Sequence, residues 1–83
     1  MDFLRLDVEC TILRAEVQMG VVMLEGIRER ISIEKKTGPS LRRLNSLWRA
    51  QYNTQKDLDA AQRALHLAEI NLAQAKQPTT QNA

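Results

Sequence analysis

The sequence contains few of the residues on which most active sites and many folds depend. Its 83 residues include one cysteine, one histidine, two prolines and three glycines, and aromatic residues make up 4% of the chain. One cysteine forms no internal disulfide, and one cysteine with one histidine is too few soft ligands for a zinc site. Glycine and proline are too scarce for an all-β domain with many turns. No apolar run approaches the roughly 20 residues that span a bilayer.

Catalytic residues are equally scarce. The lone histidine, His66, has Glu69 one turn later but no third group to complete a metal or acid–base site. In an antiparallel hairpin Cys10 falls opposite His66, which is the one catalytic hint; a small buried thiol is the alternative that we favour. We therefore expect no enzyme activity, no cofactor and no metal site. The single cysteine and the lack of a signal peptide indicate a cytoplasmic protein.

The chain is rich in the helix formers alanine, leucine, glutamine, glutamate and arginine. Its one strong break is the segment 37–40, where Gly38 suits a helix end and Pro39 or Ser40 suits a helix start. The sequence therefore predicts an all-α fold of two long antiparallel helices, a coiled-coil-like helical hairpin. We expect the helices at 3–36 and 41–76, joined by a turn at 37–40, and a disordered tail at 77–83.

Residues 3–12 allow a second interpretation. Apolar and polar residues alternate there, which is the pattern of a half-buried strand. We favour a helix, because no second segment alternates as well and a lone strand has no partner for its ladder.

The first helix carries two apolar stripes. The inner stripe has the alternating three- and four-residue spacing of a helix that packs on another helix. Its members are Phe3, Leu6, Cys10, Leu13, Val17, Gly20, Leu24, Ile27 and Ile31. The outer stripe lies largely on the opposite side, and its members are Leu4, Val8, Ile12, Ala15, Met19, Val22, Gly26 and Ile33.

The second helix covers only one of these stripes. Its own heptad positions run from Leu44 to Ala75 and suit pairing with the inner stripe. The outer stripe then needs a cover from another molecule. We expect a protein-interaction module, such as a small regulator, adaptor, chaperone or assembly subunit. Its outer stripe would form the interface, either in a homodimer that completes a four-helix bundle or on a larger protein.

Two features have two readings each. Gly20 and Gly26 lie on the two stripes of the first helix; each is either tolerated by packing or marks the close approach of another backbone. Leu41, Trp48 and Tyr52 lie beside the heptad positions near the turn. We expect these three to pack on the edge of the core, and an exposed sticky patch is the alternative.

Positive charge is concentrated around the turn in a basic tip. Its members are Arg28, Arg30, Lys35, Lys36, Arg42, Arg43 and Arg49. With Glu29 and Glu34 this segment carries +5, and the rest of the chain carries −3. Arg30 is spaced to pair with Glu34 along the helix. A solvated surface is the plain explanation; alternatives are a nucleic-acid-binding hairpin, an acidic protein partner or a membrane-surface hairpin that uses the outer stripe.

Overall fold

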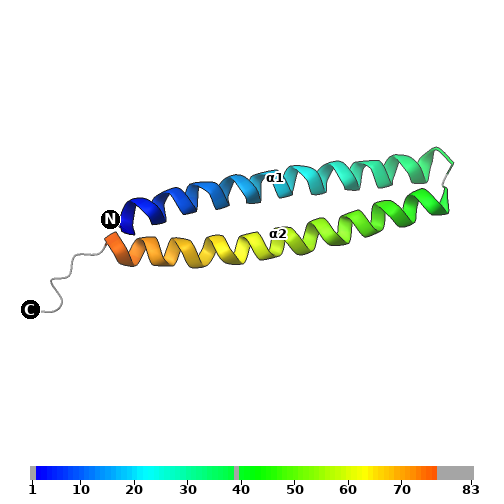
Figure 1. The fold of residues 1–83 in the computed structure, drawn as a ribbon. Coiled ribbons are helices and arrows are strands. Elements are labelled where there is room, and N and C mark those ends of the chain that lie inside the picture. The colour runs from blue at the N-terminus through cyan, green and yellow to red at the C-terminus, as the bar shows by residue number, and fades with distance from the viewer. Residues whose placement is uncertain (1, 39, 77–83) are drawn as a thin grey trace, which may run out of the picture.

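The computed structural model describes residues 2–38 and 40–76 and consists there of two antiparallel helices, α1 (Asp2–Lys36) and α2 (Leu41–Lys76) (Figure 1). The predicted all-α helical hairpin is confirmed. Residues 3–12 lie within α1, so the alternative of a strand there is wrong. The tail predicted at 77–83 lies outside the described residues.

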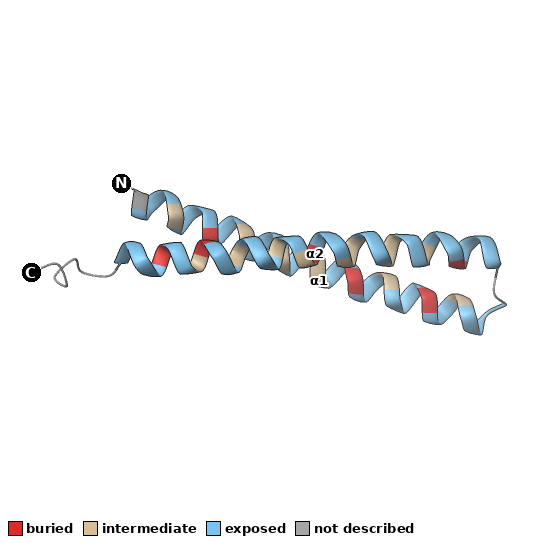
Figure 2. Ribbon diagram, turned by 90° about the horizontal axis from the view of Figure 1, so that it is seen from below, coloured by how far each residue is buried: buried red, intermediate tan, exposed pale blue. Residues whose placement is uncertain are grey.

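The hairpin is a thin rod, because its two side-by-side helices of 35 and 36 residues are each roughly 53 Å long at 1.5 Å per residue. Figure 2 shows the helices crossing near their middles, with the buried residues spread along the line of contact rather than gathered in one centre. A rod of two helices leaves large apolar side chains exposed, among them Met19 and Val22 of α1 and Leu67 of α2.

The inner stripe packs against α2 as its spacing predicts. Cys10, Leu24 and Ile31 are buried, and the other members except Phe3 are half-buried. The buried residues of α2 occupy its heptad positions, and they are Leu44, Leu58, Ala68 and Leu72. At the open end of the hairpin Phe3 remains 40% exposed, and the Lys76 ammonium lies 5.5 Å from its ring centroid. Such a cation–π contact at an exposed site is worth about 0.5–1 kcal/mol.

At Gly20 a side chain of α2 comes close to the backbone of α1. A Cβ atom at this position would lie 3.1 Å from Leu58 Cδ1, tighter than an ordinary van der Waals contact. The glycine thus lets Leu58 reach the backbone of α1 near the middle of the rod, where Figure 2 shows the helices crossing. The group that approaches Gly20 is thus the Leu58 side chain rather than the backbone of another helix.

The turn is held by side chains of both helices. Gly38 has φ of 105°, in the left-handed region that glycine tolerates at a helix end. The Ser40 hydroxyl accepts a hydrogen bond from the Arg43 amide at 3.4 Å and caps α2. The Glu34 carboxylate, from α1, accepts a bond from the Ser40 amide at 3.1 Å. It also lies 3.9 Å from Arg43 Nη1, so it faces α2 rather than pairing with Arg30.

The expectation that the three large residues near the turn pack on the edge of the core is wrong for Leu41 and Tyr52. Leu41 and Tyr52 are more than two-thirds exposed, and Trp48 is 40% exposed. They flank the line of contact, but in a pair of helices nothing lies beyond that line to cover them. They form an exposed patch beside the turn instead.

A candidate interaction surface on the outer face of α1

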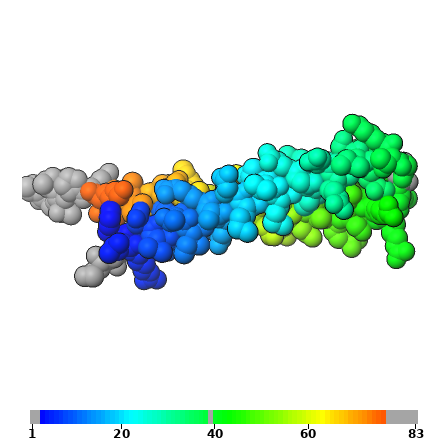
Figure 3. Space-filling view, turned by 90° about the horizontal axis from the view of Figure 1, so that it is seen from above, coloured from blue at the N-terminus to red at the C-terminus, as the bar shows by residue number. Residues whose placement is uncertain are grey.

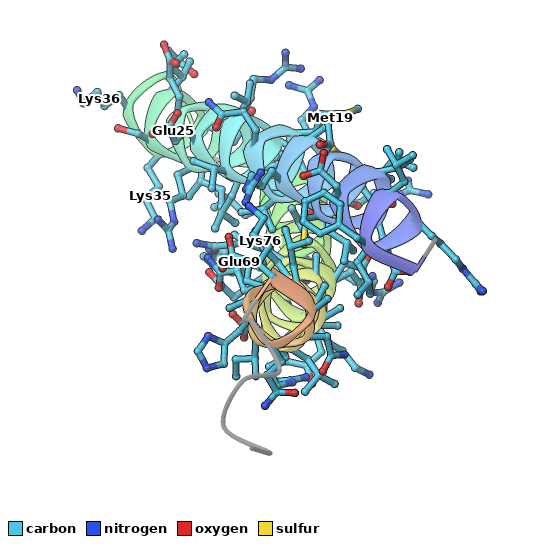
Figure 4. All side chains as sticks on the ribbon, turned by 90° about the vertical axis from the view of Figure 1, so that its left-hand side faces the viewer. Met19, Glu25, Lys35, Lys36, Glu69 and Lys76 are labelled. Atoms are coloured by element: carbon cyan, nitrogen blue, oxygen red, sulfur yellow. The ribbon has the colours of Figure 1, made fainter. Side chains whose placement is uncertain are left out.

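Every member of the outer stripe is exposed. The exposed fractions of the large ones are Leu4 68%, Val8 54%, Ile12 54%, Met19 65%, Val22 58% and Ile33 48%. Figure 3 looks down on α1 and shows its surface running from one end of the rod to the other without cover from α2. Figure 4 shows Met19 pointing away from α2, whereas Glu69 and Lys76 lie where α2 faces α1.

Several exposed apolar residues were not singled out from the sequence. Met23, 56% exposed, borders the outer stripe and widens it. Leu67 and Ile70 are 60% and 41% exposed on α2. Met23 lies one heptad after Glu16 and therefore on the same side of α1. The helical spacing that defined the outer stripe could have placed Met23 at the edge of that stripe.

A shallow trough runs beside the outer stripe from the middle of the rod to the turn. It consists of three adjoining hollows, numbered here from the middle of the rod toward the turn. Met23 lines the first and second hollows, and Arg30 and Ile33 line the second and third. The first hollow lies between the helices at Gly20, and the second lies on α1 at Gly26. The missing side chains of the two glycines thus contribute to the hollows along this face.

All seven members of the basic tip are exposed, and three of them line one hollow. Arg30, Arg42 and Arg43 surround the third hollow, whose floor includes Ile33 and Leu47. Arg28 belongs to a different contact, because its guanidinium donates to Gln55 Oε1 at 3.5 Å. Glu34 offsets part of the charge of Arg43. Three arginines around an apolar floor can bind a carboxylate or a phosphate group.

The suggested pair of Cys10 and His66 does not form. Cys10 is fully buried against Ala68 and Leu72, with Leu6 and Leu13 packed around it. His66 is exposed on α2 beside Arg63 and Leu67. The thiol therefore acts as a small apolar side chain in the core.

No group of three or more histidine, cysteine, aspartate or glutamate side chains comes together within residues 2–38 and 40–76. Neither helix over these ranges has a stretch long and apolar enough to cross a bilayer.

Searches of protein-family models, of curated proteins and of solved structures each return no match to this chain.

Proposed function

We propose that the chain is a non-enzymatic protein-interaction module, a small adaptor, regulator, chaperone or assembly subunit. Its outer stripe on α1 is the interface. The observation that carries the proposal is the row of six large apolar side chains, each about half or more exposed, along one face of one helix. A row of exposed apolar side chains bordered by charged residues is typical of interaction sites.

Burial of the outer stripe by a partner is energetically favourable. Full burial of a valine, leucine, isoleucine or methionine side chain contributes about 1.5–3 kcal/mol relative to exposure. The six large members of the outer stripe are already partly covered by their own helix, so a partner gains roughly half of this for each. Roughly 6 kcal/mol then comes from this side of the interface alone, before the entropic cost of association. Pairing with another helical hairpin would complete a four-helix bundle.

The substitution Ile12→Asp tests the proposal. It places a carboxylate in the middle of the outer stripe, and we expect association to weaken at least about tenfold because the charge would have to be desolvated. Leu67→Asp is the matched control, since Leu67 is similarly exposed but lies on α2.

The measurements are sedimentation at micromolar concentration, circular dichroism and affinity capture from the source cell. Both variants should retain helical circular dichroism. The proposal is wrong if the wild-type chain sediments as a monomer and if it, the Ile12 variant and the Leu67 variant capture the same set of proteins.

A second candidate function is anion binding by the basic tip, favoured by the convergence of Arg30, Arg42 and Arg43 around one hollow. Binding of RNA or DNA there would fall steeply with salt and would be lost on charge reversal of Arg42 and Arg43. Gel-shift titrations at low and high salt test it, with Lys56→Glu as a charge-reversal control away from the tip. Flotation with anionic vesicles distinguishes binding to a membrane surface from protein association and from nucleic-acid binding.

A further inference from the structure

Gly26 has no internal reason to be a glycine. Its backbone lies within α1, and a Cβ atom built there would meet nothing within 4 Å. Gly20 differs, because Leu58 fills the space beside it. An unrequired glycine in a helix interior is less favourable than alanine. A compensating role on an exposed apolar stripe is close contact with a side chain of another molecule.

The outer stripe is nearly symmetric about Met19. Apart from Val8, its other members form pairs whose distances along α1 on either side match to within one residue: Leu4 with Ile33, Ile12 with Gly26, and Ala15 with Val22. Val8 has no apolar counterpart, because Glu29 and Arg30 occupy the matching positions. In each of the last two pairs a branched side chain is matched with a small one. Two copies of α1 placed antiparallel and centred on Met19 would therefore seat Ile12 of each over Gly26 of the other.

The charges beside the stripe follow the same symmetry. Glu16 and Arg30 border the trough on one side of α1, and Glu9 lies one heptad before Glu16. In the antiparallel arrangement Glu9 of one copy lies next to Arg30 of the other, twice per dimer. Among the described residues neither side chain forms an ion pair within its own chain. The basic tip of each rod also lies along the acidic end of the other.

From this match of shape and charge we infer that the occupant of the outer stripe is a second copy of this chain, with the two α1 helices antiparallel about a twofold axis at Met19. The inference rests on the proposed function and specifies its partner. Shifting the register by one heptad in either direction leaves one end of the stripe uncovered and separates Ile12 from Gly26, so one register is favoured.

Cysteine cross-linking tests the arrangement. In a Cys10→Ala background, mild oxidation should cross-link Met19→Cys to itself, because the two residues lie at the axis. Leu4→Cys alone and Ile33→Cys alone should remain uncross-linked, whereas a mixture of the two should form a heterodimer. Self-cross-linking of the Leu4 variant would show a parallel dimer and overturn the inference.

Charge exchange gives an independent readout by sedimentation. Glu9→Arg should raise the dissociation constant about tenfold, because two attractive contacts become repulsive. Adding Arg30→Glu should restore most of the affinity, and Lys56→Glu, away from α1, should leave it unchanged. Absence of a dimer at micromolar concentration, with no cross-link, overturns the self-pairing. If the wild type then captures a protein that the Ile12→Asp variant does not, the proposed function stands with a different partner.

Discussion

The two apolar stripes of α1 have similar composition but different surroundings. The inner stripe includes three buried residues, whereas the large side chains of the outer stripe are about half or more exposed. Leu58 occupies the space beside the glycine of the inner stripe, and nothing lies within 4 Å of a Cβ built on the glycine of the outer stripe. One helix therefore contains a covered surface and an open surface built from the same kinds of residue. Composition alone does not decide which apolar residues form a core; the number of helices available to cover them does.

Substituting one large residue from each stripe by alanine gives the largest expected contrast. Leu24→Ala removes a side chain that is 5% exposed, and we expect a loss of about 2–3 kcal/mol in the free energy of unfolding. Val22→Ala, from a side chain 58% exposed, should change it by less than about 0.5 kcal/mol.

Urea denaturation followed by circular dichroism measures both, at protein concentrations low enough to keep the chain monomeric. Repeating the Val22→Ala titration at high concentration sharpens the comparison. A loss that grows with concentration would show that this residue stabilises an associated state. Equal losses for the two variants at low concentration would contradict the structural distinction between the stripes.

The two glycines give a contrast of intermediate size. Gly26→Ala should raise the free energy of unfolding of the isolated hairpin by about 0.5–1 kcal/mol, since alanine is the better helix former and the space is open. Gly20→Val should lower it by about 1–3 kcal/mol, because a branched side chain would meet Leu58 where the backbone is already close. Thermal and urea unfolding measure both. A higher free energy of unfolding in both variants would mean that the close contact between Leu58 and Gly20 is not needed for stability.

Much of this architecture could be predicted from the sequence, because periodicity fixes which residues share a helix face. The break at Gly38, the heptad spacing of Leu24 and the exposure of Met19 all follow from local patterns. Tyr52 and Leu41 were predicted incorrectly because their burial depends on what lies beyond the line of contact, and one chain supplies nothing there.

The pairing of Glu34 shows a second limit of sequence reasoning. Spacing along α1 predicts Arg30 as its partner, but the carboxylate reaches across the turn to Ser40 and Arg43. Contacts between the helix ends depend on the geometry of the turn, which periodicity does not specify. The same limit applies to the basic tip, where the sequence groups seven residues without showing that Arg30, Arg42 and Arg43 line one hollow.

The smallest effect should come from the turn. The Glu34 side chain is 14% exposed and accepts the Ser40 amide at the start of α2, where a negative charge interacts favourably with the helix dipole. Glu34→Gln keeps the shape and the acceptor but removes the charge, and we expect a loss of about 0.5–1 kcal/mol in the free energy of unfolding. Glu29→Gln is the matched control on an exposed site of the same helix, with no change expected beyond about 0.3 kcal/mol. Urea titrations of both variants decide whether α2 depends on a carboxylate supplied by α1, and equal stability of the two would show that the Ser40 cap alone suffices.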